Sequence, residues 1–407
     1  MIAAACTAGG PDADPPGGRE PTDDPGDHAP APDREVVECR VEELVDTPEG
    51  MPVDQVAVSA PEDVTRAVDD PYDPRLPDPL LDPDDLLPLA GPDAIISLDD
   101  PRFVPATDIR FLAGCEEVLV LDIDGDVRGY PVQIMVWHEI VNDTVGGVPV
   151  AVTFCPLCNS AVAVGRAVDG RVLEFGTSGW VHNSALVMYD RQTGSLWDHF
   201  IAKGVIGELV GTELDRFAVS TVSFEQLLAE HPDALVLTRD TGVRRSYGLN
   251  PYQFYDQPGT AFGFDGTAPE GYEEKERFLG VEGGDDAVAI RLDHLFDLGV
   301  LSFTVDGIDM VAWALPGTAG TTDLQLSNQG TDVGSTGVFL PVVDGLALTF
   351  DRDETGFVDR ETGSHWSVLG RSDAGPLAGS RLEAVAHLDT FWFAWTAFHP
   401  DTRVIDA

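Results

Sequence analysis

An ordered set of short motifs occurs twice in this chain, and this repetition constrains the fold more strongly than any other feature. The elements DG, D-R-x-T-G-S-x-W, G-x-L-x-G-x-x-L and H-P-D follow one another in residues 169–237 and again in residues 344–405. Internal repetition of this kind indicates that one structural unit is present more than once. We therefore expect two diverged tandem copies of one β-rich unit, in residues 94–245 and 246–407.

Each unit is expected to be mainly β with a few short helices, which is an α+β fold class. Residues 118–132 contain two strand-like runs around an Asp-Gly pair, a pattern typical of a hairpin. The D-R-x-T-G-S-x-W motif predicts a strand, a tight turn at Gly194 or Gly363, and a second strand. Short helices are expected within residues 131–143, which begin with proline, and within residues 223–233, where a proline ends the pattern.

The N-terminal part of the chain is expected to lie outside these units. Residues 1–35 are rich in Pro, Gly, Ala and Asp, so they predict a disordered acidic linker. Small residues precede Cys6 as in the cleavage site of a bacterial lipoprotein, although the segment before it is short and uncharged. Residues 36–93 form an N-terminal extension. These features predict an extracytoplasmic, membrane-anchored lipoprotein, attached through lipid on Cys6 and without a spanning helix.

The charge balance excludes one class of partner. The chain has 24 Lys+Arg against 71 Asp+Glu, a formal net charge of −47. Such a surface repels nucleic acid and anionic lipid, so no nucleic-acid partner is expected. An acidic surface of this density favours a halophilic protein from a high-salt host or an acidic secreted protein. Neither a protein partner nor a small-molecule partner is indicated.

The five cysteines divide into one single residue and two pairs. With Cys6 assigned to lipid, Cys39 and Cys115 remain as a candidate disulfide outside the cytoplasm. Cys155 and Cys158 form a local pair in the sequence C-P-L-C. The sequence does not establish this connectivity; it is the assignment that accounts for the odd total.

Comparison of the two copies separates expected framework residues from candidate site residues. The D-R-x-T-G-S-x-W residues and the H-P-D histidines occur in both copies and are expected to be structural. Cys155 aligns with Leu315 and Cys158 with Thr318, while His138 has no matching histidine in the second copy. We therefore predict a site in the first repeat that the second repeat lacks.

Cys155, Cys158 and His138 are the predicted ligands of a copper or zinc site. A C-P-x-C turn lets both thiolates point the same way while backbone N–H groups donate to sulfur. Two thiolates and one imidazole make three ligands, and His182, Met188, another side chain or water would supply a fourth. Methionine would favour copper, whereas histidine or water would favour zinc.

Two other interpretations of Cys155 and Cys158 stay open. In a thiol-disulfide oxidoreductase Cys155 would be the nucleophile and Cys158 the resolving thiol. However, the sequence after the pair does not predict the helix that lowers a thiol pKa in thioredoxin-like proteins. In a non-catalytic cell-surface binding module the pair would be a local staple. The sequence has no serine-hydrolase elbow, H-E-x-x-H motif or phosphate-binding loop, so enzyme activity is left open and no catalytic residue is assigned.

Several motifs together resemble those of the bacterial and archaeal domain-of-unknown-function family 3179, over about residues 94–405. The most distinctive of them, W-H-E-I-V-N-D and F-C-P-L-C, occur here without a gap. The resemblance implies an exported or lipid-anchored protein and implies no established reaction. The matching segments are LDDPRFVPATDIRFL (98–112), YPVQIMVWHEIVND (130–143), VAVTFCPLCNSAV (150–162), FGTSGWVHNSALVMYDRQTGSLWDHF (175–200) and RFLGVEGGDDAVAI (277–290).

Overall fold

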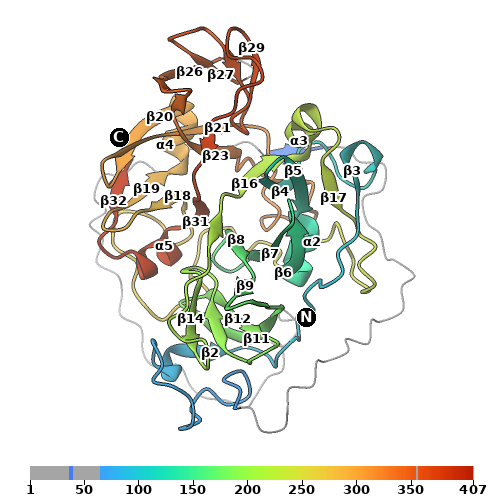
Figure 1. The fold of residues 1–407 in the computed structure, drawn as a ribbon, viewed down its shortest axis with the longest axis vertical. Coiled ribbons are helices and arrows are strands. Elements are labelled where there is room, and N and C mark those ends of the chain that lie inside the picture. Colours follow the sequence, from blue (N-terminus) through green and yellow to red (C-terminus); the bar gives the residue numbers. More distant parts are fainter. Residues whose placement is uncertain (1–35, 40–64, 354–355, 407) are drawn as a thin grey trace.

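The computed structural model describes residues 36–39, 65–353 and 356–406, and it consists mostly of β-strands (Figure 1). The expected mainly β fold with short helices is confirmed. Within these ranges no helix has the length and apolar character needed to cross a membrane. The helices of the described ranges are α2 (Val132–His138), α3 (Phe224–Glu230), α4 (Leu292–Leu298) and α5 (Trp392–Phe398), with short 3₁₀ turns η1 (Pro83–Asp85) and η2 (Ala106–Asp108).

Residues 94–245, the first half, form three sheets that we call helix-bearing, middle and outer. The helix-bearing sheet has, in spatial order, β16 (Ser220–Ser223), β4 (Glu117–Ile123), β5 (Asp126–Pro131), β17 (Leu235–Leu237) and β3 (Phe103–Pro105). The middle sheet has β15 (Arg216–Phe217), β8 (Ser160–Gly165), β7 (Val148–Cys155) and β6 (Ile140–Val145). The outer sheet has β14 (Lys203–Ile206), β13 (Leu196–Asp198), β12 (Ala185–Asp190), β11 (Phe175–His182) and, from the N-terminal extension, β2 (Leu86–Pro88), and a small hairpin joins β9 (Ala167–Val168) to β10 (Arg171–Val172).

Residues 246–406, the second half, form three sheets with the same strand order, apart from the extra edge strands β3 and β2 of the first half. The helix-bearing sheet has β31 (Leu388–Phe391), β18 (Arg277–Glu282), β19 (Ala287–Arg291) and β32 (Arg403–Ile405). The middle sheet has β30 (Glu383–Ala384), β23 (Ser335–Leu340), β21 (Ile308–Leu315) and β20 (Val300–Val305). The outer sheet has β29 (Ser372–Ala374), β28 (His365–Trp366), β27 (Phe357–Asp359) and β26 (Phe350–Arg352), and the small hairpin joins β24 (Val342–Val343) to β25 (Leu346–Ala347).

Each outer sheet packs against the helix-bearing sheet of the other half, and the two outer sheets lie at opposite ends of the molecule (Figure 1). One buried cluster joins Phe200, between β13 and β14, to Trp395 of α5. A second cluster joins Leu227 of α3 to Trp366 of β28. Because burial of apolar surface is the main driving force of folding, the two halves depend on each other for their cores.

The helix expected within residues 131–143 is shorter in the structure, where α2 ends at His138. Glu139 adopts a left-handed conformation with φ 58°, and its N–H donates to the Met135 carbonyl oxygen. Ile140, which lies within the range of the expected helix, is instead the first residue of β6 and pairs with Thr153 of β7. A short buried helix followed by a buried strand gives one continuous apolar run, which periodicity alone does not divide.

The D-R-x-T-G-S-x-W motifs of both halves have the structural role that their repetition predicts. The indole N–H of Trp197 donates to the buried carboxylate of Asp190 at 2.9 Å, and that of Trp366 donates to Asp359 at 2.9 Å. The turn glycine has φ 69° in the first motif and 71° in the second. This network satisfies a buried carboxylate in both outer sheets, as buried charge requires.

The N-terminal segment is tied to the body of the protein by a disulfide. Cys39 and Cys115, the pair suggested by the cysteine count, are bonded, with Cα atoms 5.9 Å apart. The adjoining strand β1 (Val36–Glu38) pairs with β22 (Gln329–Thr331) of the second half. The N–H of Ala319 donates to the Cys115 carbonyl oxygen at 2.9 Å. The disulfide therefore lies where the extension meets both halves.

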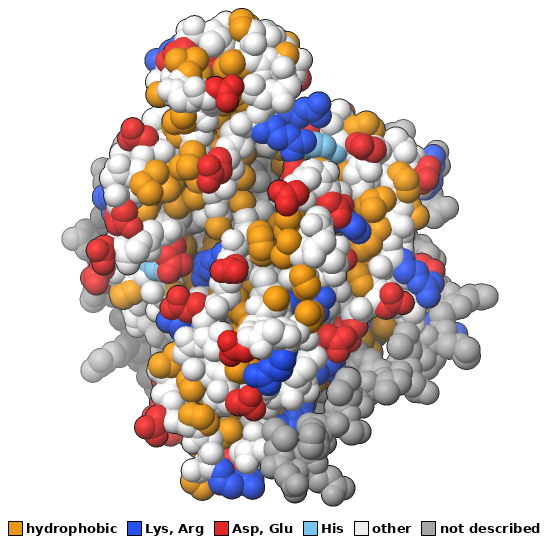
Figure 2. All heavy atoms as spheres, viewed as in Figure 1, with side chains coloured by type: hydrophobic (Ala, Val, Ile, Leu, Met, Phe, Trp, Pro, Cys, Tyr) orange, Lys and Arg blue, Asp and Glu red, His pale blue; other side chains and the backbone are white. Residues whose placement is uncertain are grey.

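Acidic, basic and apolar side chains are interspersed on the face of the molecule that Figure 2 shows. Many of the basic side chains pair with carboxylates. Examples are Arg171 with Glu208 at 3.2 Å and Arg403 with Asp286 at 2.9 Å. Such exposed pairs contribute little to stability, so the surface charge bears on solubility and partners more than on the fold.

Candidate metal centre

Three buried donor side chains meet at the junction of the middle and outer sheets of the first half. The donor atoms of Cys155, Cys158 and His199 all lie within 4.8 Å of one another. All three side chains are buried, and both cysteines are free thiols. Both belong to the apolar cluster that the second half covers. A Cys₂His set of this kind could hold a metal ion.

The two thiols are positioned by the turn between β7 and β8. Cys155 is the last residue of β7, and Ser160, its cross-strand partner, is the first residue of β8. Asn159 takes the left-handed conformation, φ 49°, that closes the turn. The N–H of Cys158 donates to the sulfur of Cys155. The C-P-L-C turn thus brings both sulfurs close together, as a metal knuckle would require.

A strand of the second half holds this turn in place through hydrogen bonds. The carbonyl oxygen of Cys158 accepts from the Thr390 hydroxyl at 2.8 Å and from the Phe391 N–H at 3.2 Å. The side-chain amide of Asn159 donates to the Asp389 carbonyl oxygen at 3.2 Å. All three partners belong to β31. The second half therefore fixes the orientation of Cys158 although it supplies no donor atom of the cluster.

The hydrogen bonds of His199 place a nitrogen lone pair toward the thiols. The Thr153 hydroxyl donates to the Val162 carbonyl oxygen at 3.1 Å. Its single proton is then used, so the contact at 3.1 Å between Thr153 Oγ1 and His199 Nδ1 requires Nδ1 to be the donor. The lone pair of Nε2 therefore faces Cys158 Sγ at 3.8 Å and Ser160 Oγ at 3.2 Å. Ligating histidines are oriented by the same kind of bond from the second nitrogen.

The spacing of the donors fits a metal ion. On a tetrahedral ion, with bonds of about 2.3 Å to sulfur and about 2.0 Å to nitrogen, the two donor atoms lie about 3.5 Å apart. The corresponding distance between Cys158 Sγ and His199 Nε2 is 3.8 Å. A small rotation of either side chain closes the difference. The hydroxyl of Ser160 lies 3.0 Å from Cys158 Sγ and completes the polar lining.

Burial and hydrogen bonding separate the acidities of the two thiols. Burial raises the pKa of Cys155, but hydrogen bonds from Cys158 and the interaction with His199 outweigh it and bring the pKa well below the usual value. Burial and the neighbouring Cys155 sulfur raise the pKa of Cys158 well above the usual value. Only one of two adjacent buried thiols thus ionises readily. A bound cation would favour ionisation of both.

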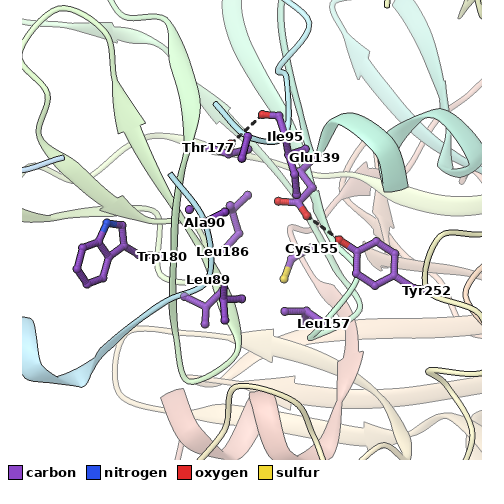
Figure 3. Close-up of a pocket in the computed structure, with 13 residues that line it drawn as sticks. Leu89, Ala90, Ile95, Glu139, Cys155, Leu157, Thr177, Trp180, Leu186 and Tyr252 are labelled. Atoms are coloured by element: carbon purple, nitrogen blue, oxygen red, sulfur yellow. Dashed lines mark hydrogen bonds between the residues drawn. The ribbon is translucent and has the colours of Figure 1, made fainter. Parts of the chain in front are cut away.

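Cys155 also lines a small cavity of about 30 Å³ (Figure 3). Apolar side chains form most of its wall, and the carboxyl of Glu139 enters it from the end of α2. The Tyr252 hydroxyl donates to Glu139 Oε1 at 3.1 Å. Burial, followed by the charge on Cys155, raises the pKa of Glu139 to about 8. Glu139 follows His138 in the sequence, and the structure places its carboxyl beside Cys155.

His138, predicted as the third ligand, is not brought to the thiols. Its Nδ1 donates to the Ile96 carbonyl oxygen at 2.6 Å, and the Tyr247 hydroxyl donates to its Nε2 at 2.6 Å. Both nitrogens are therefore engaged elsewhere, and burial lowers the pKa of His138 to about 4. The imidazole of His138 is a satisfied core group at the end of α2, and His199 takes the place expected for it in the cluster.

His182, predicted as a fourth ligand, also lies outside the cluster. Its Nδ1 donates to Asp198 Oδ2 at 2.7 Å, and Asn183 donates to its Nε2 at 3.2 Å. Met188, the other side chain considered, is buried in the same apolar cluster as the two cysteines. Cys6, the expected lipid attachment site, lies outside the described residues.

His199 is the ligand candidate that sequence reasoning missed, although a signal for it was present. The first motif continues as W-D-H-F and the second as W-S-V-L, so His199 is opposite Val368. It therefore satisfies the criterion that selected Cys155 and Cys158, namely presence in one copy only. At the helix position of His138, the last residue of α2, the second half has Leu298 at the end of α4.

Fold and site together define a class of protein: a β-rich chain whose described residues form two halves of similar strand order, with a buried Cys₂His cluster in the first half. Comparison with known families agrees with the resemblance of the motifs. The chain belongs to the family described as "Protein of unknown function (DUF3179)", whose model matches residues 92–402. Comparison with curated proteins and with solved structures gives no match.

Proposed function

We propose that this protein binds one soft transition-metal ion, zinc or copper(I), through Cys155, Cys158 and His199. The observation that carries the proposal is the convergence of three buried donor atoms within 4.8 Å, with the lone pair of the histidine facing the sulfurs. Thiolate and imidazole donors are those that zinc and copper(I) prefer. Such a site would serve metal handling or electron transfer.

Metal analysis of the purified protein tests the proposal. The protein is prepared without chelator, loaded with zinc or copper(I) and desalted, and bound metal is measured against protein. We expect one ion per chain, and loss of it in Cys155→Ser and His199→Gln. His182→Gln is the matched control, because His182 lies in the same outer sheet and is engaged with Asp198. Metal retained by His199→Gln and lost by His182→Gln would contradict the proposed ligand set.

A thiol-disulfide oxidoreductase is the second candidate function. It is favoured by one observation: the sulfur of Cys155 lines a cavity, so a small reactant could reach one thiol and not the other. The described residues after the pair form β8 and no helix, so the thioredoxin arrangement is not the source of reactivity here. A reduction potential above about −300 mV would support exchange chemistry, and a lower one a structural bond.

We infer an extracytoplasmic location, with Cys6 as the lipid-bearing residue. The disulfide between Cys39 and Cys115 supports this, because such bonds persist in oxidising compartments. Cell fractionation tests it: the full chain should be found with membranes, and Cys6→Ser should be released in soluble form. Cytoplasmic accumulation of the unmodified chain would contradict it.

We also infer that the two halves are diverged copies of one unit. The proposal is supported by the repeated motifs, the matching strand orders and the reciprocal packing of the outer sheets. In this view the second copy kept its structural role and has no donor cluster at the corresponding place. Half-chains tested alone are expected to be unfolded, and to regain structure when mixed; independent folding of either half would count against the reciprocal dependence.

A further inference from the structure

We infer that the cavity beside Cys155 is a ligand chamber, which admits a small uncharged molecule to the sulfur and excludes anions. This inference goes beyond metal binding, because it concerns access of a small molecule to Cys155 in the metal-free protein. Three observations carry the inference: the composition of the wall, the conformation of Glu139, and the segment that covers the chamber.

The wall of the chamber is apolar except at one side. Leu157, Val181 and Leu186 contribute aliphatic surface, and Glu139 with Tyr252 forms the polar side next to the Cys155 sulfur (Figure 3). Ligand sites are commonly apolar cavities with a few placed polar groups. An anion would lose its hydration here, and it would meet the Glu139 carboxyl and the Cys155 sulfur without a positive countercharge from the wall. The volume of about 30 Å³ restricts the ligand to a few heavy atoms.

The backbone at Glu139 is held in a conformation that glycine normally occupies. Glu139 has φ 58° and ψ −29°, and Gly299 occupies the same place after α4 with φ 74° and ψ −35°. The carbonyl oxygens of both residues accept from the following sheet, from Phe154 and Ala314 respectively. Strained non-glycine residues cluster at functional sites. The fold accepts glycine at this position, so the carboxyl in the chamber is not needed for the turn.

A segment that precedes the family match closes the chamber. Leu89 and Ala90 line it, whereas the family model begins at residue 92. Both backbone N–H groups donate to the carbonyl oxygen of Gly179, at 2.8 and 3.0 Å. Gly179 has φ 82°, and a Cβ there would come within 2.1 Å of the Ala90 oxygen. The segment with Leu89 and Ala90 can therefore approach β11 this closely only because residue 179 is glycine. This segment limits access to Cys155.

Two thiol reagents that share one reactive group and differ in charge test the chamber. The metal-free, reduced protein is treated with methyl methanethiosulfonate or with its anionic sulfonatoethyl analogue, and modification of Cys155 is followed by mass spectrometry. Rates are normalised to those of the urea-unfolded protein. We expect the neutral reagent to react at least about tenfold faster than the anion, because the chamber does not compensate a charge. Cys155→Ser should abolish the fast reaction.

Leu89 supplies variants that change access in opposite directions. Leu89→Ala should increase the rate at which the neutral reagent modifies Cys155, and Leu89→Trp should decrease it. Neither variant should alter the rate on the unfolded chain. Leu87 provides the matched control, because it lies in the same extension, is exposed and does not line the chamber. Equal normalised rates for the two reagents, or no reaction of Cys155 with either reagent in the folded protein, would overturn the inference. Metal stoichiometry is measured on untreated protein, so failure of the chamber and failure of the metal site are distinguished.

Discussion

The turn that carries the two thiols has a counterpart in the second half that lacks them. Cys155 ends β7 and pairs with Ser160, while Leu315 ends β21 and pairs with Ser335. The sulfur of Cys158 contacts the Ser160 hydroxyl at 3.0 Å, and the corresponding contact in the second half joins the hydroxyls of Thr318 and Ser335 at 2.8 Å. The same strand ends are thus stable with an aliphatic and a hydroxyl side chain. The thiols are not required by the fold.

The histidine and the carboxyl of the site differ between the halves in the same way. His199 follows the outer-sheet tryptophan at the position where the second half has Val368. Glu139 stands where the second half has Gly299. In contrast, the buried Asp–Trp pair of the outer sheet is identical in both halves. The comparison separates residues that the fold needs from residues that it only tolerates, and the tolerated ones converge at one place.

The largest expected effect comes from giving the first turn the residues of the second. In Cys155→Leu/Cys158→Thr we expect metal binding to be lost, a change on the order of 5 kcal/mol or more, since two of three ligands disappear. The stability of the metal-free protein should change by less than about 2 kcal/mol, because the second half carries these residues in the same setting. Metal content and urea unfolding measure the two quantities.

The matched control for this exchange is Thr318→Ser, which should leave metal content unchanged. If the double variant fails to fold, the thiols have a structural role that Leu315 and Thr318 do not reproduce. The conclusion that the fold does not require the thiols would then be wrong.

His138 should give the next largest effect, on the pH dependence of stability. Its folded pKa of about 4 lies below its ordinary value of 6.5, because burial favours the neutral form. The unfolded state therefore binds more protons than the folded state as pH falls from 6.5 to 4, and stability decreases by about 3 kcal/mol across that window. Urea unfolding of the metal-free protein at several pH values measures it, as the difference between wild type and His138→Gln.

Leu298 ends α4 as His138 ends α2, and it is 47% exposed. Leu298→Gln should therefore change stability by less than about 0.5 kcal/mol and leave its pH dependence unaltered. A wild-type curve that runs parallel to that of His138→Gln would show that His138 is not held neutral in the folded protein.

A smaller effect is expected from the residue that orients His199. Thr153→Val keeps the shape of the side chain but removes the acceptor of the Nδ1–H proton. We expect metal affinity to fall about 10- to 100-fold, as when outer-shell partners of other ligands are removed, with the stoichiometry kept. Competition with a chromophoric chelator measures it. Thr396→Val, a buried threonine on α5 that bonds a backbone carbonyl oxygen, should leave the affinity unchanged.

The smallest expected effect is an increase in stability. Glu139→Gly places the residue of the second half at the end of α2 and should stabilise the protein by about 1 kcal/mol, because it removes a strained left-handed conformation and a buried carboxyl. Urea unfolding at neutral pH measures it. Gly299→Ala should destabilise the second half by a comparable amount or more, since alanine there has the same strain. A loss of stability in Glu139→Gly would indicate that the bond from Tyr252 matters more than the strain.

The fold class and the thiol pair could be predicted from the sequence, whereas the histidine that meets the thiols was not identified, because absence of a counterpart in the second half does not report which side chains converge in space. The C-P-L-C turn, the Asp-Gly hairpin and the tight turn at Gly194 each depend on a few adjacent residues, and these predictions agree with the structure. His138 was chosen because the second copy has no histidine at the matching place. Position along the chain does not report direction, and the imidazole of His138 points to Ile96 and Tyr247 instead.

The sequence by itself determined the local elements: where strands and turns occur, that two thiols share one turn, and which motifs recur. These follow from backbone preferences and side-chain periodicity, which act over a few residues. Only the tertiary structure decided that His199 meets the thiols, that β31 clamps Cys158, and that Glu139 faces Cys155 across a cavity. Those contacts join elements far apart in the chain, and they arise because each half buries its outer sheet against the other.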